Sequence, residues 1–137
     1  MGCWAIHSFG NDDAADWLYE LEEYDDLDLV RATLAGVLSA DDYLEASQAS
    51  EALAAVEVIV AALGRPTAAA QGQEELLDWI ERVAPVPSPE LIAQARAATE
   101  RILGEDSELR ELWADTDDFA AWCDDVAKLA AQLPAQP

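Results

Sequence analysis

Apolar residues recur every three or four positions along most of this chain, which is the spacing of an amphipathic helix. The first regular run follows Asn11 and places four apolar side chains on one helical face: Ala14, Trp17, Leu18 and Leu21. Asn11 is a favourable N-cap residue, and Asp12 and Asp13 fall in the first turn, where the helix dipole favours anions. The pattern predicts a helix over residues 12–23.

Further along the chain, the same spacing and the usual start and stop signals predict six more helices. They cover residues 27–38, 50–63, 74–83, 89–103, 107–114 and 117–133. Ser88 and Pro89 form a typical helix start, and either Thr116 or Asp117 is expected to cap the last helix. Residues 67–72 fit a helix or a loop. For residues 39–49 we expect a loop or a short turn, because Ser47 and Gln48 weaken a continuous helix.

The helix predicted over residues 50–63 differs from the others because it is apolar on nearly all sides, apart from Glu51 and Glu57. A helix of this kind is normally buried in the centre of a domain. We therefore expect it to be the hub of the core. Leu38 is expected on the buried face of the preceding helix, and Trp79 at the edge of the apolar face of its own helix.

The segment before the first helix, residues 1–10, shows no helical period but contains Trp4, Ile6 and Phe9. We expect an extended or irregular segment docked on the core, and a frayed tail over residues 134–137. The predicted fold is all-α: a compact bundle of six to seven short helices forming one acidic domain over residues 1–137.

The net charge of the chain narrows the classes of partner that it could bind. The chain carries 29 acidic and 7 basic residues, a net charge of −22, together with 52% hydrophobic residues. This balance argues against direct binding to nucleic acid or to an anionic membrane, which need a basic surface, and favours a basic protein or multivalent cations. No apolar run approaches the roughly 18 residues of a membrane span, and no export signal is seen. We expect a cytoplasmic protein in which Cys3 and Cys123 are free thiols.

The N-terminus resembles a family of bacterial proteins known only as a domain of unknown function. Its members begin with a pattern like Met-Gly-x-Trp-Gly-x-Gly-x-Phe-x-Asn-Asp-x-Ala-x-Asp. The matching residues are Met1, Gly2, Trp4, Phe9, Asn11, Asp12, Ala14 and Asp16, whereas Ala5 and His7 replace two glycines. Residues 50–66 and the segment 117–122 are also similar to the family. The resemblance implies a small bacterial helical domain and implies no activity.

The same N-terminal stretch holds the densest group of candidate site residues. We expect a binding role for Trp4, His7, Phe9, Asn11, Asp12, Asp13 and Asp16. The acids and Asn11 could form a divalent-cation site or a general acid/base pair. The structural alternative, which we favour, is a capped helix start with solvated acids. A metal site built from Cys3, His7 and Cys123 is the weaker alternative, since structural zinc usually has four ligands at more specific spacings. We assign no catalytic residue, resident metal or cofactor.

Recognisable catalytic motifs are missing from the sequence: it contains no phosphate-binding glycine loop, no Gly-x-Ser-x-Gly, no His-Glu-x-x-His and no Cys-x-x-Cys. With His7 and Lys128 as the only histidine and lysine, the choice of general bases is small. The leading hypothesis is a non-enzymatic binding protein, similar to an immunity protein or a nucleic-acid mimic, whose acidic surface binds a basic protein. The alternatives are a small divalent-metal-dependent enzyme that uses the N-terminal acids, and a self-associating scaffold.

Overall fold

The computed structural model describes residues 12–40 and 42–134, and this part of the chain folds into eight α-helices. In chain order they are α1 (Asp12–Leu21), α2 (Asp28–Leu38), α3 (Ala46–Ala62), α4 (Ala68–Gln71), α5 (Glu74–Val83), α6 (Pro89–Leu103), α7 (Glu108–Ala114) and α8 (Phe119–Ala131). The only β-type pairing between described residues is an isolated bridge, Leu44 to Ser107. The predicted all-α fold is confirmed, and the short α4 accounts for the helix beyond the expected seven. The predicted docked segment, residues 1–10, lies outside the described residues.

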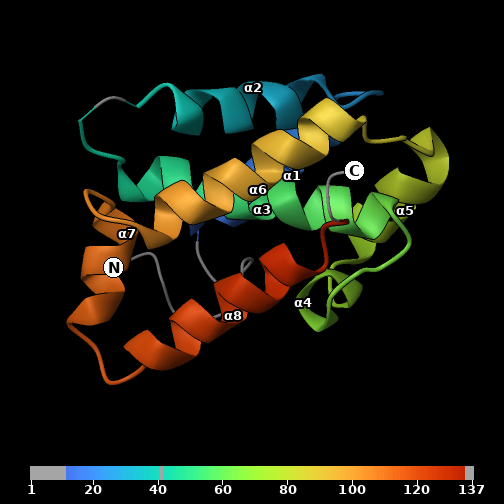
Figure 1. Ribbon diagram of the computed structural model, residues 1–137. Coiled ribbons are helices and arrows are strands. Elements are labelled where there is room, and N and C mark those ends of the chain that lie inside the picture. Colours follow the sequence, from blue (N-terminus) through green and yellow to red (C-terminus); the bar gives the residue numbers. More distant parts are fainter. Residues whose placement is uncertain (1–11, 41, 135–137) are drawn as a thin grey trace.

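Helix α3 runs through the middle of the molecule and packs against each of the other described helices, with α2 and α8 on opposite sides of it in the view of Figure 1. Its sequence explains this position. Nearly every residue from Ala52 to Ala61 is apolar, and all of them are buried. Four of these positions are alanines, whose small side chains let neighbouring helices come close. The hub predicted from the apolar pattern is thus confirmed.

The start of α3 corrects the sequence prediction, because the helix begins at Ala46 and includes Ser47, Gln48 and Ser50. The reason is a tertiary cap. The backbone N–H of Ala46 donates a hydrogen bond to Oε1 of Glu108, 62 residues further along the chain, at 2.8 Å. The Leu44–Ser107 bridge holds the two segments together through two backbone hydrogen bonds of 2.8 and 2.9 Å. Side-chain capping of the free N–H groups at a helix start stabilises that first turn.

Local signals fix the end of α3. Gly64 has φ 84° and follows the last turn, and Arg65 donates its backbone N–H back to the carbonyl of Val60 at 3.1 Å. This is a Schellman motif, in which glycine accepts a left-handed conformation at low cost. Thr67 then starts α4, because its hydroxyl accepts the N–H of Ala70. Residues 67–72, which fitted either a helix or a loop, therefore hold one helical turn.

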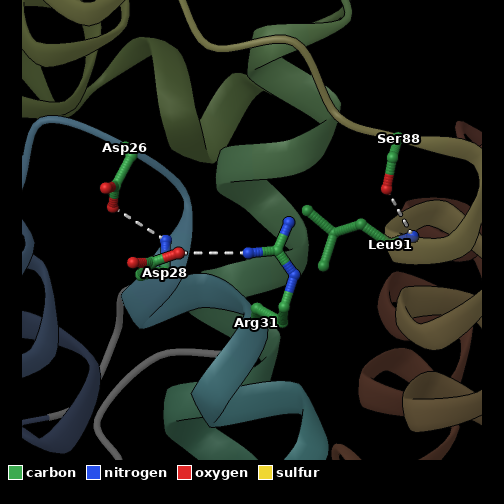
Figure 2. A network of polar contacts seen from close by, with 5 residues as sticks. All are labelled: Asp26, Asp28, Arg31, Ser88 and Leu91. Carbon is green, nitrogen blue, oxygen red and sulfur yellow. Dashed lines mark hydrogen bonds and ion pairs between the residues drawn. The ribbon is translucent and has the colours of Figure 1, made fainter.

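The starts of α2 and α6 show how single polar side chains set helix boundaries (Figure 2). Asp26 accepts the backbone N–H of Asp28 at 3.0 Å, and the Asp28 carboxylate pairs with Arg31 one turn later. Ser88 accepts the N–H of Leu91 at 3.1 Å, as expected of an N-cap followed by proline. The predicted extent of both helices agrees with the structure to within a residue.

Three expectations about individual residues were wrong. Trp79 lies in the core with 2% of its surface exposed rather than at an edge, because its indole N–H finds a backbone partner in Tyr24. Leu38 is 41% exposed, since α2 ends there and Val37 takes the inward position. The N-cap position of α8 is Asp118 and carries no side-chain cap. Thr116 instead accepts the N–H of Asp118 in the preceding turn.

The C-terminal part of the bundle is held by aromatic packing between α7 and α8. The Trp122 ring stacks on those of Trp113 and Phe119, with ring centroids 6.4 Å apart in each pair. Offset stacking of this kind contributes about 0.5–1.5 kcal/mol beyond the area that it buries. None of the helices in the described ranges is long and apolar enough to cross a membrane.

Candidate functional site

The predicted N-terminal site is only partly described by the structure. Asp12 and Asp13 form the first turn of α1, Asp16 follows one turn later, and all three are exposed. The remaining residues predicted for this site lie outside the described residues: Trp4, His7, Phe9 and Asn11. Asp12 and Asp13 therefore sit where the helix dipole favours acids, which is what the structural interpretation expects.

Within residues 12–40 and 42–134, no three or more Asp, Glu, His or Cys side chains are grouped so that they could hold a metal ion. The divalent-metal hypothesis also needs His7 and Asn11, so it stays a prediction. Cys123 is half-buried and packs against the core beside Trp122.

A like-charge contact links α1 to the hub helix. Burial raises the pKa of Glu51, which lies on the first half of α3, and the charges of Asp13 and Glu20 on α1 raise it further. The charged form of Glu51 is thus disfavoured in the folded protein. This is a place where the excess of negative charge acts against folding.

A second acidic region is formed by the end of α1, the following loop and α5. The Trp79 indole donates to the Tyr24 carbonyl at 2.8 Å, and one nitrogen of Arg82 lies 2.6 Å from the Asp25 carboxylate. The other terminal nitrogen of Arg82 donates to the Glu22 carbonyl at 3.3 Å. These contacts hold α5 against the loop.

We call the resulting surface the α1–α5 face, made of Tyr19, Glu22, Asp25, Glu75 and Arg82.

A small pocket of about 190 Å³ lies on the α1–α5 face. It is lined by Ala15, Leu18, Tyr19, Glu22, Gln73 and Glu75. Tyr19 is 76% exposed, the largest exposed aromatic surface among the described residues, and Glu22 and Glu75 are exposed acids from two different helical regions. An aromatic ring beside two carboxylates matches the side chain of a lysine or an arginine, which combines an apolar stem with a cationic head.

Each of the seven basic side chains of the chain is already engaged in an intramolecular contact. Three contact carboxylates: Arg31, Arg82 and Lys128. Three donate to backbone carbonyls: Arg65, Arg96 and Arg101. The guanidinium of Arg110 lies 5.7 Å from the Phe119 ring centroid. The 29 acids of the chain far outnumber its seven bases, so its net charge is −22.

A larger pocket, of about 640 Å³, opens between the α3–α4 turn and α8 and shares Gln73 with the smaller one. Its lining includes Glu57, whose side chain is 2% exposed and whose carboxylate accepts a hydrogen bond from Thr67 at 2.6 Å. Arg65, Asp125 and Lys128 also line it. We call this the Glu57 pocket.

A third polar contact joins the segment before α3 to α7. The Tyr43 hydroxyl donates to the Glu111 carboxylate at 2.7 Å, and this hydrogen bond raises the pKa of Tyr43 to about 12. Both side chains are exposed. The contact supports the tertiary cap of α3 and lies apart from both pockets.

Comparison with known proteins identifies the family. A family model described as a domain of unknown function (DUF4259) matches residues 2–125. The chain belongs to this family. The match confirms the expectation, drawn from the N-terminal motif, of a family known only as a domain of unknown function. No curated protein and no solved structure matches the DUF4259 chain. The α1–α5 face lies entirely within the matched residues, whereas the Glu57 pocket extends past them to Lys128 and Gln132.

Sequence reasoning missed both pockets, although each left a signal. Tyr19 lies outside the apolar stripe of the first helix. The sequence pattern therefore places a large aromatic side chain on the side that faces solvent. Glu57 is the one acid in the second half of an otherwise apolar helix. An acid in such a position must be exposed at a break in the packing or buried with polar partners, and either outcome marks a site to inspect.

Proposed function

We propose that this DUF4259 domain is a binding protein that captures a basic protein segment on its α1–α5 face. The observation that carries the proposal is the exposed Tyr19 ring beside the carboxylates of Glu22 and Glu75 at a small pocket. A lysine or arginine of the partner would place its stem along the ring and its cationic head between the two acids. Cation–π and charge contacts of this kind are the common way of recognising such side chains.

The charge distribution supports the same proposal. A net charge of −22, with every basic side chain engaged internally, gives a long-range negative potential. Such a potential speeds the encounter with a basic partner and disfavours acidic competitors. The protein would act by covering the cationic surface of its partner, as an immunity protein or a nucleic-acid mimic does.

The test uses two variants that remove the same charge from different faces. Glu22→Gln/Glu75→Gln lowers the negative charge on the α1–α5 face, and Asp115→Asn/Asp117→Asn does so at the exposed turn between α7 and α8. Tagged wild type and both variants are used to capture proteins from the native host, read by mass spectrometry. The captured partner is then purified and its Kd measured at about 0.05 and 0.5 M salt.

We expect a basic protein that binds wild type and the Asp115/Asp117 variant, binds the Glu22/Glu75 variant at least about tenfold more weakly, and loses affinity at high salt. Equal affinity for the two variants would contradict the assignment to the α1–α5 face. Binding that is unchanged between the two salt concentrations would contradict the electrostatic mechanism itself.

A further inference from the structure

The small pocket on the α1–α5 face, which we call the α1–α5 pocket, is formed by two segments of the chain. Four of its lining residues are spaced as one face of a helix: Ala15, Leu18, Tyr19 and Glu22. Glu22 follows the last residue of α1 but continues the helical turn, because its N–H donates to the Tyr19 carbonyl at 3.3 Å. Gln73 and Glu75 line the pocket from the start of α5. The pocket therefore has polar groups from two sides.

Each of these polar groups offers hydrogen-bond acceptors. Glu22 and Glu75 are exposed, and within the described ranges no ion pair joins either carboxylate to a basic residue. Gln73 occupies the N-cap position of α5, but its side chain makes no cap hydrogen bond, which leaves its amide oxygen for a ligand. Two carboxylates and one amide oxygen thus line a pocket of about 190 Å³. A cation that is to satisfy all three needs several N–H donors that point in different directions.

The rest of the lining is apolar. The Tyr19 ring is 76% exposed, and Leu18 and Ala15 supply the remaining apolar surface. A guanidinium is planar, stacks on aromatic rings and is more weakly hydrated than an ammonium. It can therefore lie against the ring while its edge reaches the acceptors, and it loses less hydration energy on entering the pocket than the head group of a lysine.

The α1–α5 face already holds one guanidinium of the chain itself. One terminal nitrogen of Arg82 lies 2.6 Å from the Asp25 carboxylate, and the other donates to the Glu22 carbonyl at 3.3 Å. Two nitrogens of one side chain thus meet acceptors of two different residues, whereas the donors of an ammonium all radiate from a single nitrogen. This contact is an example, within the chain, of how a guanidinium joins separate acceptors on this face.

We propose that the α1–α5 pocket selects arginine over lysine, with the guanidinium stacked on Tyr19 and donating to the acceptors of Glu22, Gln73 and Glu75. This inference rests on the proposed function, since it names the side chain of the basic partner that enters the pocket. An arginine supplies five N–H donors in one plane, which is enough for the three acceptor groups, whereas a lysine supplies three from one nitrogen. Methylation of the guanidinium keeps its charge but blocks bidentate hydrogen bonding, so a methylated arginine should bind more weakly.

Three peptides of equal charge test the choice of side chain with the purified full-length chain. Each is an acetylated and amidated nonapeptide of the repeat Gly-Ser-X, in which X is arginine, lysine or asymmetric dimethylarginine. The amide resonances of Tyr19 and Glu75, followed by NMR at about 0.05 M salt, locate the site and give the Kd. We expect the arginine peptide to bind at least about fivefold more tightly than each of the others. A lysine or a dimethylarginine peptide that binds as tightly as the arginine peptide overturns the inference.

Two tyrosine variants assign the preference to the ring. Tyr19→Leu should lower the ratio of the lysine Kd to the arginine Kd below about twofold, because leucine cannot stack on a guanidinium. Tyr43→Leu, which removes an exposed tyrosine outside the pocket, should keep the full ratio. Circular dichroism confirms that each variant is folded, as we expect of changes to exposed side chains. A ratio that is unchanged in folded Tyr19→Leu overturns the inference.

The Glu22→Gln/Glu75→Gln variant separates this inference from the proposed function. If the arginine and lysine peptides bind wild type with equal affinity and both lose affinity in this variant, the proposed function stands and only the preference for arginine is overturned. If neither peptide binds wild type at the α1–α5 face, or if the variant binds as tightly as wild type, the proposed function fails and the inference fails with it.

Discussion

The indole nitrogen of Trp79 on α5 donates a 2.8 Å hydrogen bond to the backbone carbonyl of Tyr24, in the loop between α1 and α2. The contact pairs the indole N–H of the largest side chain of α5, which is buried, with a carbonyl that lies outside any helix. The neighbouring Arg82–Asp25 pair reinforces it from the surface. The geometry of the α1–α5 face therefore depends on a core residue that is not itself part of that face.

Trp79→Phe should lower the free energy of unfolding by about 1–3 kcal/mol, because it leaves the Tyr24 carbonyl without its donor and removes part of a buried ring. Urea denaturation of the variant and the wild type measures the change. The same variant should weaken binding at the α1–α5 face, since the loop loses its attachment to α5. A loss below about 0.5 kcal/mol would mean that water or another donor replaces the indole at no cost.

Two substitutions at positions with a left-handed backbone conformation should change the stability of the protein in opposite directions. Gly64 (φ 84°) follows α3 and Ala84 (φ 49°) follows α5, so each ends its helix in the conformation that favours glycine. Gly64→Ala should destabilise the protein by about 1 kcal/mol. Ala84→Gly should stabilise it by about 0.5 kcal/mol, because relief of the left-handed strain exceeds the added entropy of the unfolded chain. Thermal unfolding of both variants provides the comparison, and shifts of the same sign would refute the argument.

Glu51→Gln should stabilise the protein at neutral pH by a few tenths of a kcal/mol. The pKa of Glu51 is raised in the folded state by burial and by Asp13 and Glu20, so its protonated form favours folding and its charged form opposes it. The favourable contribution is complete below the pKa of the unfolded chain, and it is lost as the pH rises through the raised pKa. The difference in the free energy of unfolding between variant and wild type is measured by urea denaturation from pH 3.5 to 7.5. It should be largest at pH 7.5 and vanish at pH 3.5.

Glu108→Ala removes the side-chain cap of α3 and should cost about 1–2 kcal/mol, the usual value for a lost helix cap. Glu105→Ala is the matched control, since the exposed Glu105 contributes only its backbone carbonyl to the contact with Arg101. The amide resonances of Ala46 and its neighbours should shift in the first variant and not in the second. Equal stability of the two variants would show that the Leu44–Ser107 bridge alone is enough to hold the start of α3.

Helix boundaries were predictable wherever local chemistry sets them. Gly64 ends α3, and Ser88 with Pro89 starts α6, because capping and left-handed turns involve residues only a few positions apart. The start of α3 could not be found in this way, since the group that caps Ala46 is Glu108. The burial of Trp79 was missed for the same reason: its partner, the Tyr24 carbonyl, belongs to a distant part of the chain.

The pockets were harder to predict than the fold. The apolar pattern indicates which face of each helix is buried, but it does not indicate which polar residues from different helices meet. Tyr19 and Glu75, or Glu57 and Lys128, come together only once α1, α3, α5 and α8 have packed. The N-terminal acids are dense in sequence, and their role as a binding site stays a prediction because the other residues of that site lie outside the described ranges.

The central position of α3 also determines how this domain can open. Every other described helix packs on α3, so no single helix shields the α3 backbone alone. Solvent therefore reaches the amide protons of Ala52 to Ala61 only when most of the bundle has separated. In deuterium exchange these amides should be the slowest of the domain and should exchange together, at a rate set by the free energy of global unfolding. The outer helices can fray one at a time, whereas α3 can open only with the whole domain.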